Sequence, residues 1–259
     1  MDALRTSSVL DQQTALPLPE CVALLLQGGG ALGSYQAGVY QELDRNGIEV
    51  DWVAGISIGA VNAAIIAGNP PEDRMAKLRS FWDTLSASLP DLLFIPNDGI
   101  REVAHLAAAS AVAMFGVPGF FHPHFLPTLM AQPGSASATS LYDSSPLIAT
   151  LNNHIDWDLL NDGPVRLSVG AVDVESGNFI YFDTRGPDRV RIDHRHIMAS
   201  GALPPGLPAI QIDGRHYWDG GLVSNTPLAH VLDHQQGDML IFQVDLFPAE
   251  GPLPLEITD

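Results

Sequence analysis

The first third of the chain alternates short apolar runs with segments whose apolar residues repeat at helical spacing. Residues 21–26 and 50–54 are almost entirely apolar, which is typical of strands buried on both faces of a parallel sheet. A helix is predicted after each run, and the second, at residues 58–67, consists of small apolar residues that favour full burial. The apolar positions that mark the first helix are Tyr35, Val39 and Leu43.

The second half of the chain contains shorter apolar segments separated by turn residues. Residues 165–174 and 179–182 flank a Glu-Ser-Gly-Asn turn and predict a hairpin. A second hairpin is predicted around Asp213-Gly214, and the apolar run at residues 239–246 predicts a last strand. The order of strands and helices favours a three-layer α/β/α fold with a mostly parallel central sheet.

The length of 259 residues fits one large domain. Residues 1–20 are polar and predict a flexible N-terminal leader, and the domain is expected over residues 21–247. Within it, residues 102–115 are predicted to be helical, whereas residues 116–140 are rich in Gly, Pro, Ser and aromatic residues and predict a loop or lid. Residues 248–259 contain no clear element, and we expect a tail of a chain that is cut short.

Charge and cysteine content narrow the function classes. The formal net charge is −18, and no basic cluster interrupts it, so nucleic acid is not an expected partner. The single cysteine, Cys21, excludes an intrachain disulfide and a zinc site of several thiolates. The N-terminal residues do not resemble a secretory signal, and no apolar run is long enough to span a membrane. We therefore expect a cytoplasmic protein.

Two glycine-bracketed turns follow the first two predicted strands. In the sequence GISIG, two glycines remove side chains where strand and helix approach closely, and Ser57 sits at the corner between them as a candidate nucleophile. In the sequence GGGALG, successive glycines can turn their backbone N–H groups towards one anion, as an oxyanion hole requires. The residues of these two turns are Gly28, Gly29, Gly30, Gly33, Gly55, Ser57 and Gly59.

The first turn also has the spacing G-x-G-x-x-G, which is typical of dinucleotide-binding loops. Glu49 and Asp51 lie near the distance at which such proteins place a ribose-binding acid. A nucleotide-binding module that uses residues 28–33 is therefore the alternative from a different class. It gives no reason for a second glycine-bracketed serine, whereas an acyl hydrolase requires both turns.

A third motif, Asp219-Gly220-Gly221, follows Tyr-Trp and places a carboxylate on a turn. With these three motifs, and with the segment ASGALP at residues 199–204, the chain resembles the patatin-like phospholipase family, and its opening LQGGGALG is similar to a bacterial subgroup. The resemblance covers residues 22 to about 245. It implies a catalytic pair in which Ser57 is the nucleophile and Asp219 its base.

The resemblance further implies a lipid acyl hydrolase of the phospholipase A or esterase type, with the N–H groups of the 28–30 turn as oxyanion hole. An acyltransferase or thioesterase with the same acyl-serine chemistry is the alternative. No metal or organic cofactor is expected. Because a free Asp has a pKa of about 3.9, we expect Asp219 to be partly buried and within hydrogen-bond reach of Ser57.

The expected partner is a lipid or another acyl ester. Many relatives carry a basic residue at position 32, whereas this chain has Leu32, which argues against an anionic headgroup at that position. Membrane contact, if it occurs, is expected through apolar loop residues, because the net charge opposes anionic lipid. The apolar residues concerned are Phe115, Phe120, Phe121, Phe125, Leu126 and Met130. The sequence leaves three roles open for them: lining an acyl pocket, contact with a lipid surface, or ordinary packing under a loop.

Overall fold

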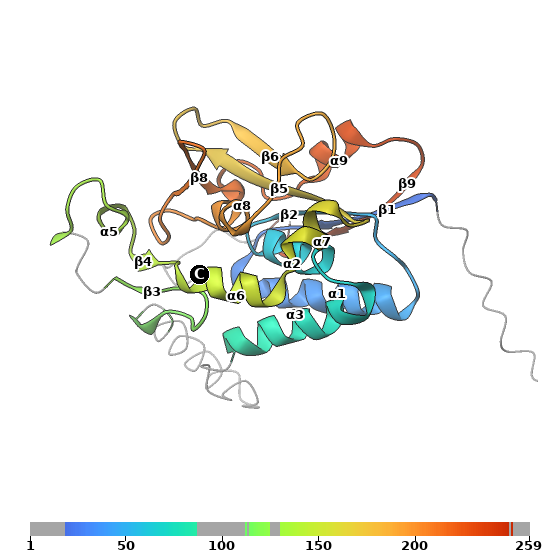
Figure 1. Ribbon diagram of the computed structural model, residues 1–259, viewed down its shortest axis with the longest axis horizontal. Helices are drawn as coiled ribbons and strands as arrows, with labels where there is room; N and C mark the ends of the chain where they lie inside the picture. The colour runs from blue at the N-terminus through green and yellow to red at the C-terminus, as the bar shows by residue number, and fades with distance from the viewer. Residues whose placement is uncertain (1–18, 87–111, 113, 125–129, 249, 251–259) are drawn as a thin grey trace, which may run out of the picture.

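The computed structural model describes residues 19–86, 112, 114–124, 130–248 and 250. A seven-stranded sheet runs through their centre, in the order β7-β8-β5-β2-β1-β9, with β6 paired to β5 (Figure 1). Its strands are β1 (Cys21–Leu26), β2 (Trp52–Ile56), β5 (Arg166–Asp173), β6 (Phe179–Asp183), β7 (Ile210–Ile212), β8 (Arg215–Asp219) and β9 (Met239–Val244).

Four neighbouring strands, β9, β1, β2 and β5, are parallel, and the two predicted hairpins add β6, β7 and β8 in antiparallel pairing. The predicted α/β fold with a mostly parallel central sheet is thereby confirmed. The second strand begins two residues later than expected. Asp51 lies just before the strand: its carboxylate accepts a hydrogen bond from the Val22 N–H at 2.8 Å, and its own N–H donates to the carbonyl oxygen of Val22 at 2.9 Å.

The helices cover the two faces of the sheet unequally (Figure 1). A large core lies between one face and the helices on that side, and a smaller core on the other face includes Val231. On the first side lie α1 (Ser34–Arg45), α2 (Ile58–Ala67), α3 (Pro71–Ser86), α6 (Pro146–His154), α7 (Trp157–Asp162) and α8 (His194–Ser200). On the second side lies α9 (Leu228–His234), and Val231 comes from it.

Strand β5 holds the arrangement that matters most for the site. One of its edges pairs with β6, and the other is shared end to end by β2 and β8. Because β2 runs parallel and β8 antiparallel to β5, the carboxyl ends of β2 and β8 meet. Ile56 lies opposite Gly170 and Asp219 lies opposite Ala171, the next residue of β5.

The predicted loop at residues 116–140 contains two short elements, β3 (His122–Pro123) and α5 (Ala136–Thr139), and β3 pairs with β4 (Tyr142–Asp143). Its role as a lid stays a prediction. Most of the predicted helix at 102–115, nearly all of the leader and almost all of the tail lie outside the described residues. Among the helices that the structure describes, none combines the length and apolarity needed to cross a membrane.

Helix α2 packs against the strands so closely that two positions accept only glycine. A Cβ atom at Gly59 would lie 2.1 Å from the carbonyl oxygen of Leu26, and one at Gly55 would lie 2.3 Å from the carbonyl oxygen of Gly59. These are backbone atoms, which cannot move aside without shifting a strand or the helix. The two glycines therefore set the distance between helix α2 and the sheet.

We predict opposite effects for the same substitution in two helices. Gly59→Ala lowers the free energy of unfolding by about 3 kcal/mol, because overpacking against backbone outweighs the gain in helix propensity. Gly38→Ala in α1, where a Cβ meets no atom within 4 Å, raises the free energy of unfolding by up to about 1 kcal/mol. Urea denaturation of both variants measures the difference, and equal effects would contradict the packing argument.

Candidate active site

Ser57 occupies a strained corner between β2 and α2. Its φ is 55° and its ψ is −123°, a left-handed backbone conformation that is unfavourable for a residue with a side chain. The Ser57 N–H donates to the Ser200 hydroxyl at 2.9 Å, and this hydroxyl donates in turn to the carbonyl oxygen of Gly170 at 2.6 Å. Fully buried Ser200 thus ties the corner to β5 and to α8.

Asp219 ends β8 and is 4% exposed, so it is more deeply buried than expected from the sequence. Burial raises the pKa of its carboxyl group above the usual value, although the Ser57 side chain and the Gly221 N–H, as hydrogen-bond partners, oppose this effect. The Gly221 N–H donates to Oδ1 of Asp219 at 2.7 Å. The structure therefore brings Ser57 and Asp219 together, with the carboxyl group largely shielded from water.

The glycine turn that follows β1 lies against Ser57. A Cβ atom at Gly28 would lie 3.0 Å from Cβ of Ser57 and 2.4 Å from Oδ1 of Asn225. The Gly28 N–H donates to the carbonyl oxygen of Asn225 at 3.4 Å, and the Asn225 side chain donates back to the carbonyl oxygen of Gly28 at 2.9 Å. The N–H of Gly29 has no acceptor among the described residues. Gly30 has a φ of 56° and open space beside it.

The remaining motif glycines mark close contacts around this centre. A Cβ atom at Gly33 would lie 2.7 Å from the Ile58 side chain. At Gly220 it would lie 2.8 Å from the carbonyl oxygen of Gly170, and at Gly221 it would lie 3.1 Å from Oδ1 of Asp219. All the residues singled out in the three motifs therefore belong to one continuous region.

Buried polar side chains support the glycine turn from the helical side. The carbonyl oxygen of Gln27 accepts a hydrogen bond from Gln36 of α1 at 2.7 Å. Asn62 of α2 donates to Gln36 at 2.8 Å and to the carbonyl oxygen of Gly33 at 2.9 Å. Trp82 donates to Asn62 at 3.1 Å, so α1, α2 and α3 are joined beneath the turn.

The same turn is fixed from its other side by Gln27. Its side-chain oxygen accepts from the N–H groups of Leu246 and Phe247 at 2.6 and 3.2 Å, and its side-chain nitrogen donates to the Thr226 hydroxyl at 3.0 Å. Segments from both ends of the chain therefore hold the turn in place.

Sequence reasoning included Ser200 in the segment ASGALP but gave it no role of its own, and it did not single out Asn225 or Asn62. Only Asn62 carried a local signal, because a buried amide inside an otherwise apolar helix needs partners. Ser200 and Asn225 lie 143 and 197 residues from their partners, so no local pattern relates them.

The two acidic residues of the dinucleotide alternative, Glu49 and Asp51, both precede β2 and so lie at the amino end of the sheet. Asp51 precedes β2 and binds the N–H of Val22, at the amino end of β1. The glycine turn follows the carboxyl end of the same strand. A six-residue strand separates the two ends by roughly 20 Å, so Asp51 cannot reach a ligand at the turn.

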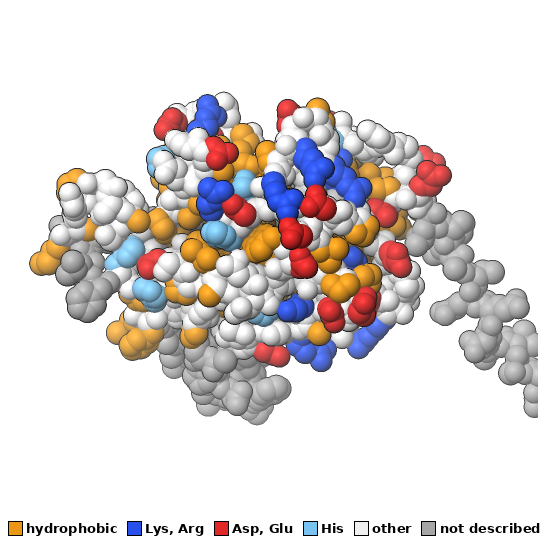
Figure 2. All heavy atoms as spheres, viewed as in Figure 1, with side chains coloured by type: hydrophobic (Ala, Val, Ile, Leu, Met, Phe, Trp, Pro, Cys, Tyr) orange, Lys and Arg blue, Asp and Glu red, His pale blue; other side chains and the backbone are white. Residues whose placement is uncertain are grey.

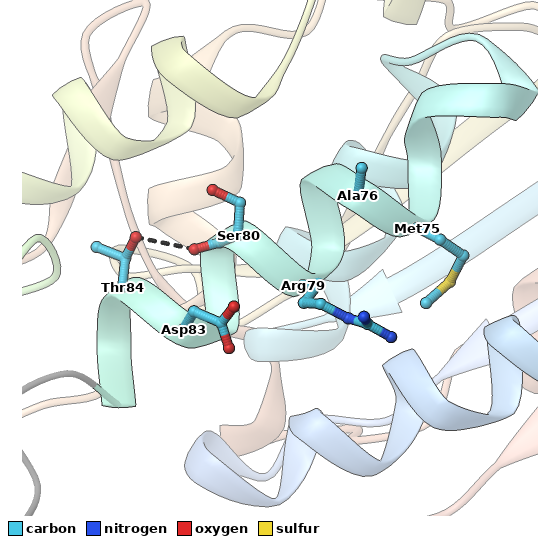
Figure 3. Close-up of a pocket in the computed structure, with 6 residues that line it drawn as sticks. All are labelled: Met75, Ala76, Arg79, Ser80, Asp83 and Thr84. Carbon is cyan, nitrogen blue, oxygen red and sulfur yellow. Dashed lines mark hydrogen bonds between the residues drawn. The ribbon is translucent and has the colours of Figure 1, made fainter.

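A hollow of about 730 Å³ lies on α3, away from these segments. Figure 3 shows that its lining side chains come from one face of that single helix, with Arg79 and Asp83 one turn apart. No residue of the three motifs lines it. This hollow therefore does not belong to the candidate active site at Ser57.

A match to a known protein family covers the region around Ser57 and Asp219. The profile of the family described as patatin-like phospholipase matches residues 24–232, which include the three glycine-containing motifs. The chain belongs to the patatin-like phospholipase family. The family match thus confirms the resemblance inferred from the sequence motifs.

The relatives of this family member are much longer proteins. It is 23% identical to lysophospholipase NTE1 of Saccharomyces cerevisiae over all of its own length but 12% of that protein. It is 24% identical to an uncharacterized NTE family protein of Mycobacterium tuberculosis over 81% of its own length and 45% of that protein. The chain therefore spans less than half the length of these curated relatives.

Among solved structures, VipD from Legionella pneumophila is similar with a TM-score of 0.43 and 16% identity, over 87% of this chain and 50% of that one. The type III effector protein ExoU is similar with a TM-score of 0.32 and 20% identity, over 72% of this chain and 41% of that one.

We predict that Asp219→Asn stabilises the fold at neutral pH. The folded state raises the pKa of this carboxyl group, so ionised Asp219 costs folding free energy above both its unfolded and its folded pKa. Asn keeps an oxygen for the Gly221 N–H and carries no charge. Urea denaturation at pH 7.5 is expected to show a more stable variant. The stability difference between the variant and wild type shrinks as the pH falls through the pKa of Asp219. A variant that is less stable than wild type at neutral pH would contradict a raised pKa for Asp219.

Proposed function

We propose that this chain is a lipid acyl hydrolase of the phospholipase A or esterase type, which cleaves carboxylic esters through Ser57 and Asp219. The observation that carries the proposal is the meeting of a strained serine, a desolvated carboxyl group and an open glycine turn at the ends of β1, β2 and β8. These are the groups that nucleophilic acyl transfer needs. The family match supports the same reaction class.

In the first half-reaction, the Ser57 hydroxyl oxygen attacks the ester carbonyl carbon and its proton passes to the Asp219 carboxylate. The carbonyl π electrons move onto the oxygen, which becomes a tetrahedral oxyanion. Collapse of this intermediate breaks the bond to the alcohol oxygen, which takes the proton from Asp219. An acyl-Ser57 ester remains. A raised pKa suits Asp219 to this work, because its ionised form is then a stronger base than a free Asp.

The N–H groups of the glycine turn and the N-terminus of α2 are the proposed donors for the oxyanion. Within the predicted set of Gly28, Gly29 and Gly30, the last two are the better placed, because the Gly28 N–H already donates to Asn225. The clamp from Asn225 would then orient the turn, and Gly28 would supply the close approach to Ser57.

In the second half-reaction, water attacks the acyl-Ser57 carbonyl carbon and gives its proton to Asp219, and the serine leaves as the free hydroxyl once it has taken that proton back. If an alcohol or thiol attacked the acyl-Ser57 ester in place of water, the chain would act as an acyltransferase. The yeast relative is named a lysophospholipase. Lysophospholipids and phospholipids are therefore the first lipids to offer as substrates.

The decisive experiment compares wild type, Ser57→Ala and Asp219→Asn on p-nitrophenyl esters and on lysophosphatidylcholine. Both substitutions are expected to lower kcat/KM at least about 1,000-fold, because each removes a group that acts in the transition state. A fluorophosphonate probe should label wild type at Ser57 and should label the Asp219→Asn variant far more slowly.

Circular dichroism of each variant controls for folding. Activity that survives Ser57→Ala would remove the serine mechanism. Labelling of Ser57 together with transfer of the acyl group to added glycerol, at the expense of free fatty acid, would favour the acyltransferase alternative.

A further prediction concerns the clamp on the glycine turn. Asn225→Ala removes the donor to the Gly28 carbonyl oxygen and is expected to lower kcat about 10- to 100-fold with a smaller change in KM. Ser224→Ala, one residue away on the same exposed loop, is the matched control and should leave both constants near wild type. Equal effects of the two variants would contradict a positioning role for Asn225.

A further inference from the structure

Large hydrophobic side chains stand exposed around Ser57. Six of them lie on the four segments that form or flank the site: Tyr35, which is 64% exposed, and five others that are each between 46% and 58% exposed. We call these five residues the apolar rim: Leu32, Leu203, Leu222, Val223 and Phe247. Clusters of this kind are uncommon on the free surface of a protein and mark places where something binds.

Hydrogen bonds and close contacts tie the rim segments to the site. Leu32 hydrogen-bonds through its N–H to the carbonyl oxygen of Gly29, and the Phe247 ring would lie 3.3 Å from a Cβ on that same glycine. Leu203 donates its N–H to Gly201, whose Cβ position is 3.9 Å from the Ser57 hydroxyl oxygen. The segments that carry these rim residues therefore lie beside half-buried Ser57 and not on a distant face.

Leu222 and Val223 complete the rim on the side of Asp219. Leu222 ends the short 3-10 helix η4 (Gly220–Leu222), which Asp219 caps, and Val223 donates its N–H to Gly220 at 3.0 Å. Two residues later, the Asn225 side chain donates a hydrogen bond to the carbonyl oxygen of Gly28 in the glycine turn. These side chains are therefore held outward on a backbone fixed by the site.

The apolar surface continues beyond the rim. Leu141, which is 51% exposed, donates its N–H to the carbonyl oxygen of Pro205 beside the Leu203 segment. Leu141 precedes β4, and Figure 2 shows mainly hydrophobic and His side chains with few charges at the end of the molecule that carries β3, β4 and α5. The Lys and Arg side chains visible in that view gather mainly over the rest of the molecule.

The charges of the rim segments distinguish between lipid surfaces. Residues 27–35, 199–208, 219–227 and 244–248 contain no Lys or Arg, and their only charged residues are buried Asp219 and exposed Asp245. The whole chain has a net charge of −18. An anionic surface would meet repulsion without any local cation, whereas an electrically neutral surface can accept apolar side chains without that cost.

We propose that the apolar rim is a docking surface for electrically neutral or zwitterionic lipid aggregates, which it enters by apolar insertion. This inference rests on the proposed function, because docking would serve hydrolysis by bringing the ester bonds of a lipid surface to Ser57. The docking itself requires no chemistry. It can therefore be measured on a variant that cannot hydrolyse lipid.

The experiment measures binding of Ser57→Ala protein to phosphatidylcholine vesicles by flotation, with Leu203→Ser and Leu232→Ser added separately. These two leucines are matched, being 50% and 46% exposed, but Leu232 lies on α9, outside the rim. Leu203→Ser is expected to weaken vesicle binding about 10-fold, because an inserted leucine contributes a large part of its transfer free energy. Leu232→Ser is expected to leave binding unchanged.

Two further arms sharpen the result. Adding Val223→Ser to Leu203→Ser should weaken binding again, and vesicles with 30% phosphatidylglycerol should bind less protein than pure phosphatidylcholine at low salt. Ser57-competent forms of the rim variants should keep wild-type kcat/KM on p-nitrophenyl acetate, which is monomeric in water. Their activity on lipid aggregates should fall with vesicle binding.

Equal binding by the Leu203→Ser and Leu232→Ser proteins would overturn the proposal, as would tighter binding to the anionic vesicles. A wild-type dimer in sedimentation that Leu203→Ser dissociates, without vesicle binding, would assign the rim to a second copy of the chain instead. If vesicle binding follows the predicted order but no ester is cleaved, the docking surface stands and the proposed hydrolase function fails.

Discussion

The site depends on one pairing constraint, the sharing of a single edge of β5 by two strands that approach from opposite directions. β2 arrives parallel to β5 and leaves the edge after Ile56, and β8 arrives antiparallel and ends with Asp219 opposite the next residue of β5. Ser57 and Asp219 therefore meet because the pairing of β2 with β5 and the pairing of β8 with β5 end at adjacent residues of β5. This meeting places the strained corner at Ser57 next to the buried carboxyl group of Asp219.

Two buried aspartates in the same sheet show how their surroundings decide between structure and chemistry. Burial alone would raise the pKa of Asp183, but hydrogen bonds from His230, Arg166, Ser168 and the Arg185 backbone lower it far below the usual value. Asp219 has only the Ser57 side chain and one backbone N–H to oppose burial, and its pKa is raised. A fully paired carboxylate is a poor base, so the scarcity of partners at Asp219 agrees with the role of base that we propose for it.

The sequence predicted those parts of the fold that are written locally. Apolar runs, turn residues and glycine spacing located the strands of the central sheet, both hairpins and the motif residues, because burial on a parallel sheet and tight turns restrict residue types at each position. The short strands β3 and β4 were not predicted. The end-to-end meeting of β2 and β8 could not be predicted, since it depends on register between distant strands. The same holds for Ser200 and Asn225, whose hydrogen bonds span more than a hundred residues. Asp219 was predicted to be partly buried, and in the structure it is almost fully buried.

The charge of the chain and its exposed hydrophobic side chains are best understood together. Exposed leucine and phenylalanine side chains favour association of one copy with another, and apolar contact alone does not distinguish a second copy from a lipid surface. A net charge of −18 favours the lipid surface that we propose, because two copies repel each other while an uncharged lipid surface does not. The absence of Lys and Arg from the rim segments extends this discrimination to the headgroups, because no local cation compensates for an anionic surface. In the proposed docking, the acidic charge of the chain and the apolar side chains beside Ser57 therefore both favour a neutral lipid surface over a second copy or an anionic surface.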